Sequence, residues 1–273
     1  MKRDFTLKIY IELLQSLLQH GYQFITFEEF MAGELPSDAK VVILRHDVDA
    51  RKLNSLEFAR IQATFGIKGT YFFRMVPASF SIPVIKKVKI LGHEIGYHYE
   101  DINKALKEVK HQNRNLMQFE EALIDKAWEL FKAHLAILRD LYPIRTISMH
   151  GSPLSKYDNK LVWKKYNYRD EGIIGEPYYD IDFNDMAYFT DTGRRWNGLK
   201  VSVRDKVHSR YKFDYKSTNQ IINSISSLPD KVMFTFHPQR WTDNPLLWTQ
   251  EFILQNIKNL IKRLYTTPET DEP

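Results

Sequence analysis

The 273-residue sequence contains no cysteine, which excludes disulfide bonds and thiolate metal ligands. Any bound metal would be held by His, Asp and Glu side chains, a donor set that suits zinc or a harder divalent ion. The sequence also lacks an apolar run long enough to cross a bilayer, and its first residues have no apolar signal-peptide segment. From these absences we expect a cytoplasmic protein without a membrane span.

Charge of one sign is not concentrated anywhere, although Lys and Arg outnumber Asp and Glu by 39 to 34 and the pI is near 9.1. The densest basic cluster is Lys86, Lys87 and Lys89, in a segment with a helical pattern. A basic excess can serve to bind nucleic acid or acidic glycans. Because the cations are dispersed, we interpret them as a lysine-rich surface and predict no nucleic-acid partner.

The hydrophobic pattern is that of a folded α/β protein, with 43% hydrophobic residues. Short apolar runs, typical of strands buried on both faces, recur along the chain at 41–44, 69–73, 94–97, 146–149, 172–175 and 232–236. Helical patterns cover 6–20, 53–65, 104–141 with a break near 111–113, and 246–264. Alternating strands and helices predict a mostly parallel sheet, in a barrel or a doubly wound arrangement.

No interior linker is rich in Gly, Pro or Ser, so we predict one main domain. A helical segment at 1–40 would pack on the α/β domain at 41–265, and the polar tail at 266–273 would be frayed. Residues 176–217 lack clear periodicity, which indicates long loops with short strands.

Five polar side chains follow the predicted strands, each just past the carboxyl end: Asp47, Asp49, His98, His150 and His237. In parallel α/β folds this edge of the sheet is where ligands bind and catalysis occurs. The sequence therefore predicts a functional site formed by four separate strand ends.

The two aspartates lie two residues apart, so on an extended strand their side chains point the same way. Because neighbouring carboxylates repel, they need a cation or a shared proton. A metal on one and a proton-shuttling role for the other would satisfy both. The alternative is structural: an aspartate that caps the next helix and pairs with Arg45 or Arg51.

The histidines differ in what their positions indicate. His93 and His98 are five residues apart and would face opposite sides of a strand, so we interpret His93 as packed or hydrogen-bonded and His98 as a ligand. Glu100 shares the face of His98 and is a reserve candidate. His150 lies in a Gly- and Pro-containing turn, where a ligand and a loop-stabilising role both remain open. For His237, which follows a very apolar strand, we favour function.

The segment Asp191-Thr192-Gly193-Arg194-Arg195-Trp196 combines charge with an aromatic face. Tryptophan faces commonly stack on sugar rings, so this loop is a candidate substrate contact. A surface turn with a cation–π contact explains the same residues equally well.

Three motifs resemble those of the polysaccharide deacetylases, carbohydrate esterase family 4. They are Asp47-Val48-Asp49-Ala50, Gly69-Thr70-Tyr71-Phe72-Phe73, and the most specific, Gly92-His93-Glu94-Ile95-Gly96-Tyr97-His98. The resemblance extends over about 41–241. It implies a distorted (β/α)7 barrel and a hydrolase that removes N- or O-acetyl groups from sugars, usually with a divalent metal.

The resemblance also implies roles for individual residues. Asp47 would be the general base, Asp49 a metal ligand, and His237 the group that protonates the leaving amine. The second histidine of the family's metal motif is replaced by Ile102, which cannot bind metal. As a hypothesis, His150 supplies the missing ligand beside Asp49 and His98.

The family's arginine motif R-x-P-Y is likewise replaced, by His150-Gly151-Ser152-Pro153. Arg45, Arg194 or Arg195 would take over the orienting role of the lost arginine. These three arginines, with Trp196 and Trp241, are the predicted substrate-binding residues.

The sequence therefore predicts a metal-dependent hydrolase, with zinc as the expected cofactor, that deacylates a sugar or a polysaccharide precursor. Two alternatives remain open. One, motivated by Ile102, is a metal-independent amide hydrolase on the same fold. The other is a non-catalytic glycan-binding protein.

Overall fold

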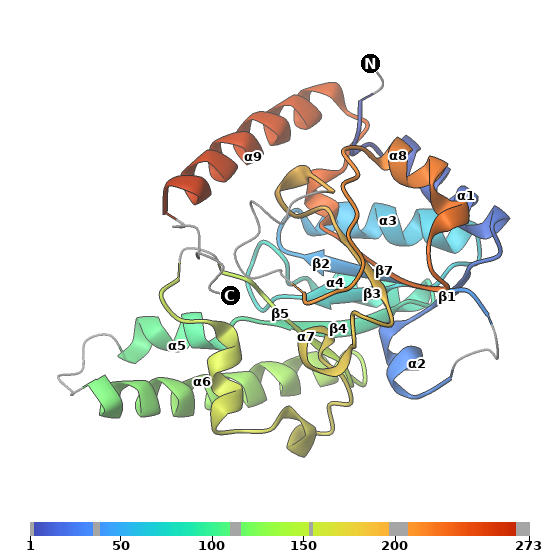
Figure 1. Cartoon of the computed structure of the whole chain (residues 1–273). Helices are drawn as coiled ribbons and strands as arrows, with labels where there is room; N and C mark the ends of the chain where they lie inside the picture. Colours follow the sequence, from blue (N-terminus) through green and yellow to red (C-terminus); the bar gives the residue numbers. More distant parts are fainter. Residues whose placement is uncertain (1–2, 35–38, 110–115, 153–154, 197–206, 266–273) are drawn as a thin grey trace.

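The computed structural model describes residues 3–34, 39–109, 116–152, 155–196 and 207–265. Helices and strands alternate through most of the chain (Figure 1). The strands are β1 (Gln23–Ile25), β2 (Val41–Val48), β3 (Thr70–Phe73), β4 (Glu94–Tyr99), β5 (Ile147–Met149), β6 (Ala187–Thr190) and β7 (Lys231–Phe236). The helices are α1 (Leu7–Gln19), α2 (Phe27–Met31), α3 (Lys52–Thr64), α4 (Ile82–Ile90), α5 (Asp101–Val109), α6 (Leu116–Arg139), α7 (Pro177–Asp180), α8 (Thr218–Asn223) and α9 (Pro245–Tyr265).

All paired strands run parallel, in the order β5-β4-β3-β2-β7-β6, and β1 pairs with the start of β2. The order is cyclic. On one side of β2 the strands follow as β3, β4 and β5, and on the other side they follow as β7 and β6. A doubly wound sheet would rise outward on both sides. A bridge from Thr146 to Gly175 continues the cycle beyond β5. The predicted distorted α/β barrel is thus confirmed, with its opening between Gly175 and β6.

The larger core lies between the outer face of this sheet and the helices. α1 buries the stripe Ile9, Tyr10, Leu13, Leu14 and Leu17, and its N-terminus is capped by the Thr6 side chain. The alternate residues of β2 that face outward join this layer, as do side chains of α3 and α6. The stripe at 6–20 that the sequence shows is therefore the face by which α1 covers the barrel.

A second, smaller cluster fills the amino end of the barrel interior, where Val41, Ile43, Phe72 and Met233 pack against Phe27. Gly96 makes room for this packing, because a Cβ there would lie 2.3 Å from the Phe72 ring. This explains one glycine of the 92–98 motif in physical terms. With the amino end closed by apolar side chains, the polar residues that point inward gather at the carboxyl end.

Most predicted elements agree with the structure to within a few residues, including the strands at 41–44 and 94–97 and the helix at 53–65. The strand predicted at 172–175 is wrong, because only the single bridge at Gly175 forms there. The segment 176–217 contains a barrel strand, β6. The segment 1–40 contributes β1 to the sheet as well as helices. The predicted break near 111–113 and the tail at 266–273 lie outside the described residues.

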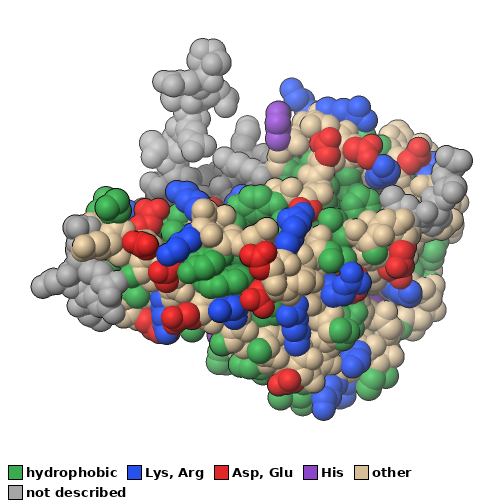
Figure 2. Space-filling model, turned by 90° about the horizontal axis from the view of Figure 1, so that it is seen from below, with side chains coloured by type: hydrophobic (Ala, Val, Ile, Leu, Met, Phe, Trp, Pro, Cys, Tyr) green, Lys and Arg blue, Asp and Glu red, His purple; other side chains and the backbone are tan. Residues whose placement is uncertain are grey.

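Over the face seen in Figure 2, basic and acidic side chains are interspersed, as the dispersed lysines of the sequence indicate. In the part of the chain that the structure describes, no helix has the length and apolar content that a membrane crossing requires.

Candidate functional site

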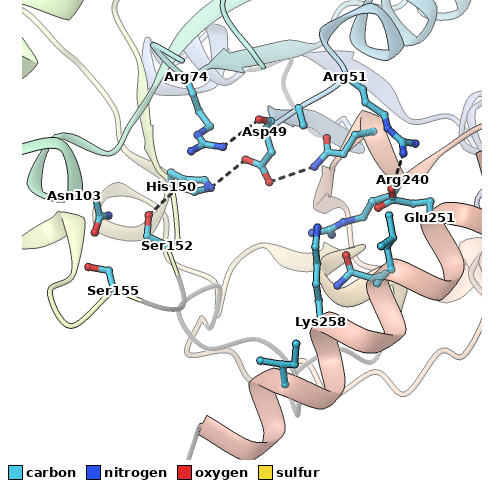
Figure 3. A pocket seen from close by; sticks show the side chains of 15 residues that line it. Asp49, Arg51, Arg74, Asn103, His150, Ser152, Ser155, Arg240, Glu251 and Lys258 are labelled. Atoms are coloured by element: carbon cyan, nitrogen blue, oxygen red, sulfur yellow. Dashed lines mark hydrogen bonds and ion pairs between the residues drawn. The ribbon is translucent and has the colours of Figure 1, made fainter. Parts of the chain in front are cut away.

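The carboxyl ends of β2, β4 and β5 bring three of the predicted residues together around one carboxylate oxygen. Asp49 Oδ1 lies 3.4 Å from His98 Nε2 and 3.5 Å from His150 Nε2. His237, after β7, places its Nε2 3.8 Å from Asp49 Oδ2. Figure 3 shows Asp49 and His150 pointing toward each other, joined by a dashed line.

The two histidines beside Asp49 are oriented through their other ring nitrogen. His98 Nδ1 donates to the carbonyl oxygen of Ser148 at 2.9 Å. His150 Nδ1 lies 3.0 Å from Ser152 Oγ and 3.4 Å from Glu100 Oε2. These contacts place a proton on Nδ1 of each ring and leave Nε2 as the ring atom directed at Asp49. That is the arrangement found in metal-binding histidines.

The electrostatics of the cluster favour an ionised Asp49. Burial by itself raises the pKa of this carboxyl, but the charges of His150 and His237 and the contact with His98 lower it well below its ordinary value. Burial lowers the pKa of His98, and the two aspartates raise it further than burial lowers it. Among the described residues, none forms a hydrogen bond with the buried Asp49 Oδ1. A buried, ionised oxygen without a donor is a position that suits a cation.

Asp49, His98 and His150 match a divalent metal in donor type and in two of their separations. Ligands about 2.1 Å from a tetrahedral zinc ion lie about 3.4 Å from one another, close to the two distances at Asp49 Oδ1. Asp49, His98 and His150 are the side chains that would hold it. Across the described ranges, no group of three or more His, Asp or Glu side chains is placed so that it could hold a metal ion as it stands.

Asp47 is held by an arginine of its own strand. Arg45 Nε and Nη2 donate to Asp47 Oδ1 and Oδ2 at 2.9 and 2.7 Å, and both side chains are buried. Arg45 also contacts the Tyr178 hydroxyl at 3.2 Å. Asp47 Oδ2 lies 3.7 Å from His98 Nε2, so both aspartates face the same histidine. Of the three arginines predicted to orient the site, Arg45 occupies that position.

His237 forms a buried pair with Asp191. Its Nδ1 lies 2.5 Å from Asp191 Oδ1, and its backbone N–H donates to Asp191 Oδ2 at 3.0 Å. Arg240 and the Trp241 indole also donate to this carboxylate. Burial raises the pKa of Asp191, but the charges of His237 and Arg240 lower it more strongly, so the net shift is downward. The carboxylate therefore fixes the orientation of the imidazole.

A cavity of about 790 Å³ opens above these residues, within the usual range for a small-molecule site. Its floor includes Asp49, His150 and Gln239, and Gln239 Nε2 donates to Asp49 Oδ2 at 3.3 Å. One wall comes from α9. The remaining described lining residues are Ala50, Arg51, Arg74, Asn103, Ser152, Ser155, Arg240, Glu251, Leu254, Gln255, Lys258 and Ile261.

None of the five predicted substrate-binding residues is among the described residues that line this cavity, although Arg45 contacts Asp47 of the site. Trp196 and Trp241 are buried in the outer core, and their indole N–H groups donate to Thr218 and Asp191. Neither ring has a face available for a sugar. Arg194 is buried over Trp248, with its centre 4.3 Å from that ring, and Arg195 is exposed.

The structural interpretation of His93 agrees with the geometry. Its Nδ1 accepts from Gly69 N–H, and its Nε2 donates to the Ala59 carbonyl oxygen. Ile102 is buried in the core. Glu100, the reserve candidate for a metal ligand, lies beside His150. Arg74 holds it through contacts of 3.2 and 2.6 Å.

The sequence pattern does not predict a role for Asp191 in the site, because this residue stands out there only as part of the charged segment 191–196. Asp191 follows β6 just as the other site residues follow their strands. The signal was the run Ala187-Tyr188-Phe189-Thr190 before it, which lies inside a segment without periodicity. Arg74 also follows a strand, β3, but an arginine alone did not indicate a site.

No protein-family model matches the sequence, and no curated protein sequence matches it either. The solved structures that it resembles include the Streptococcus pyogenes deacetylase PplD in complex with acetate, at 16% identity over 60% of this chain and 71% of that one, with a TM-score of 0.40. A Streptococcus mutans CE4 esterase is 14% identical over 87% and 84%, with a TM-score of 0.41. A CE4 family pseudoenzyme from Bacillus anthracis is 12% identical over 83% of this chain, which spans 63% of that one, with a TM-score of 0.42.

These proteins belong to the family that the motifs at 47–50, 69–73 and 92–98 resemble. Identities and TM-scores this low say nothing of activity, and one of the three proteins is a pseudoenzyme. What this chain does has to be inferred from its own residues.

Proposed function

We propose that the chain is a divergent polysaccharide deacetylase that uses a divalent metal, with zinc as the first candidate, to remove an acyl group from a sugar or a polysaccharide precursor. The observation that supports this most is the buried Asp49 Oδ1 between the Nε2 atoms of His98 and His150. It lies beside both the Arg45–Asp47 pair and the Asp191–His237 pair.

Asp49, His98 and His150 would hold the metal, and three protein ligands leave a coordination position open. When bound, a divalent ion supplies Lewis-acid chemistry, which polarises an acyl carbonyl and lowers the pKa of water. In this assignment His150, from the end of β5, takes the role of the family's second metal-binding histidine, whose position Ile102 occupies. Glu100 keeps His150 in the required orientation through Nδ1.

Asp47 is the proposed general base. Its two contacts with Arg45 fix the plane of the carboxylate, and each oxygen retains a lone pair for a proton. The oxygen nearest His98 is Oδ2, so this is the atom that faces the site. Water attacking the acyl carbon would transfer its proton there.

His237 is the proposed general acid. Its Nδ1 is directed at Asp191, which leaves Nε2 facing Asp49. A proton on Nε2 would pass to the nitrogen or oxygen of the departing sugar as the bond to the acyl carbon breaks. The negative charge of Asp191 stabilises the imidazolium before that transfer.

The experiment is a paired measurement of metal content and acetate release. Purified wild type is expected to contain stoichiometric zinc or another divalent ion, and to release acetate from at least one member of a panel of N- and O-acetylated sugars. Chelation should abolish release, and added zinc should restore it. Asp49→Asn should contain no metal, while His208→Ala, which removes an exposed histidine, should match wild type.

Three outcomes would contradict parts of this proposal. Full hydrolysis by metal-free protein rejects the metal. Full metal affinity in His150→Ala rejects the third ligand. Saturable glycan binding by the zinc-loaded protein without acetate release from any substrate rejects catalysis and supports a glycan-binding protein.

A further inference from the structure

Helix α9 presents its polar side to the protein and its apolar side to the outside. Glu251, Gln255 and Asn259, one turn apart, are buried. Asn259 donates to the Gly193 carbonyl oxygen, and Glu251 pairs with Arg51 at 3.4 Å. The exposed apolar residues of the helix are Leu246, Leu247, Phe252, Ile253, Leu254, Ile257, Leu260 and Ile261.

This orientation is the reverse of what a surface helix normally adopts, in which the apolar stripe packs on the core. The orientation is fixed by defined contacts, because the buried polar side chains Glu251 and Asn259 have specific partners. Ile253, Ile257 and Leu260 are 53%, 50% and 60% exposed and follow the i, i+4, i+7 spacing of one stripe. A continuous apolar stripe of this kind indicates that an apolar ligand or surface covers it.

The apolar stripe is continuous with the cavity of the candidate site. Leu254, Lys258 and Ile261 form the neighbouring stripe of the same helix, and all three line the cavity. In Figure 3, Lys258 points from α9 into the space between the helix and the strand ends. The apolar surface therefore begins inside the cavity, opposite Asp49 and His150, and extends over the rim.

Among the described Lys and Arg side chains that line this cavity, Lys258 remains available for a ligand. The other three basic side chains of the lining already contact carboxylates: Arg51 contacts Glu251, Arg74 contacts Glu100, and Arg240 contacts Asp191. Within the described ranges, Lys258 has no hydrogen bond or ion pair. It lies between the polar floor and the apolar rim, where it would meet a negative charge in the middle of a bound molecule.

We propose that the substrate is an acylated sugar joined through phosphate to a lipid chain. This deepens the proposed deacetylase function and depends on it. The sugar occupies the end with Asp49 and His150, and the phosphate lies against Lys258. The lipid extends over Leu254 and Ile261 to the stripe of Ile253, Ile257 and Leu260. A second copy of the chain on this face would cover residues that line the cavity and obstruct it.

The experiment compares two substrates that share one acetylated sugar, one of them free and the other joined through diphosphate to a polyprenyl chain in detergent micelles. Zinc-loaded wild type is expected to have a kcat/KM about 10-fold or more higher for the lipid-linked form, because several methylene groups leave water on binding. The double variant Ile253→Gln, Ile257→Gln and the variant Lys258→Gln should each lower this ratio. Ile90→Gln, on the distant helix α4 and 81% exposed, is the matched control and should keep it.

Equal kcat/KM values for the two substrates would overturn the lipid inference alone and leave the deacetylase function in place. The lipid inference would also be overturned if wild type is a dimer by light scattering, the double variant is a monomer, and the double variant keeps the wild-type ratio of the two kcat/KM values. Saturable binding of the lipid-linked sugar without acetate release from either substrate would contradict the deacetylase function instead. If the protein neither binds the lipid-linked sugar nor releases acetate, both the lipid inference and the deacetylase function are overturned.

Discussion

Two pairs of histidines in this protein, His46 with His93 and His98 with the half-buried His150, differ in how their ring nitrogens are used. His46 and His93 lie outside the barrel, between sheet and helices, and protein groups contact both nitrogens of each ring. His98 and His150 lie at the carboxyl end of the barrel, and protein hydrogen bonds orient only their Nδ1 atoms. Their Nε2 atoms face Asp49.

The difference also appears in the pKa values. Burial lowers the pKa of His46 to about 3, so that ring stays neutral and stacks on Tyr71 with 4.1 Å between ring centres. The aspartates raise the pKa of His98 despite its burial. Burial alone therefore does not distinguish a structural histidine from a functional one. The distinguishing feature is a nitrogen that the protein leaves available.

The largest effect is expected at His237, which by this criterion belongs with the functional pair. His237→Asn keeps a donor near Asp191 but removes Nε2, so kcat should fall by about 10²–10⁴-fold, the range for loss of a general acid. Because Arg240 and Trp241 still contact Asp191, the melting temperature should change little. Steady-state acetate release and thermal unfolding check both; a kcat within a factor of two of wild type would place His237 with the structural histidines.

A smaller effect is expected from Glu100→Gln, which acts on one functional histidine through its Nδ1 side. Loss of the carboxylate beside His150 should weaken zinc affinity by about 10–100-fold, as for other changes behind a metal ligand. Competition with a chromogenic chelator measures this. The comparison variant is Glu108→Gln, an exposed residue of α5, the helix that follows Glu100, whose zinc affinity should equal that of wild type.

His46→Ala tests the structural pair. It leaves Gln62 and the Thr70 carbonyl oxygen buried with one partner fewer, so the free energy of unfolding should fall by about 1–3 kcal/mol. Zinc content and kcat of the folded protein should remain those of wild type. Urea unfolding with and without zinc gives the first quantity. Loss of zinc with an unchanged unfolding free energy would reverse the assignment of the two pairs.

The smallest effect extends the comparison to carboxylates. Glu94 accepts from Thr70, Thr146 and the Glu28 N–H, and burial raises its pKa from 4.5 to about 7. Between these two pH values the folded state keeps a proton that the unfolded state has lost. The free energy of unfolding should therefore fall with rising pH across this window, by about 1 kcal/mol per pH unit at most.

Glu94→Gln should lose this component of the slope, while an exposed variant such as Glu57→Gln should keep it. Urea titrations at four pH values between 5 and 8 measure the difference. Identical slopes in wild type and Glu94→Gln would show that Glu94 does not hold the proton.

Much of the site could be predicted because its residues obey one local rule, that a polar side chain follows an apolar strand. Asp49, His98 and His150 each met it in the sequence. Asp191 meets it too, but β6 is short and its neighbours have no periodicity, so the strand was not visible. The choice of Arg45 over Arg194 needed three dimensions, because only the fold shows which guanidinium reaches Asp47.

Trp196 and Trp241 are residues that the sequence assigns to the site but the structure places in the core. An indole beside charged residues suggests a sugar-stacking face, but sequence carries no direct measure of burial, and both rings lie in the core. The periodicity of α9 predicted a helix correctly and gave no sign that its apolar side faces outward. That orientation depends on partners such as Gly193 and Arg51, which are remote in the sequence.

Arg45 and Asp47 are alternate residues of a single strand, so the base and the group that orients it form one rigid unit. An orienting arginine placed on a different loop would have to be repositioned whenever that loop changed length. Here the loops after β5 and β6 can acquire insertions or new sequences beyond His150 and Asp191 without misaligning the base. The arrangement favours evolutionary change in substrate range while the proton-transfer chemistry stays constant.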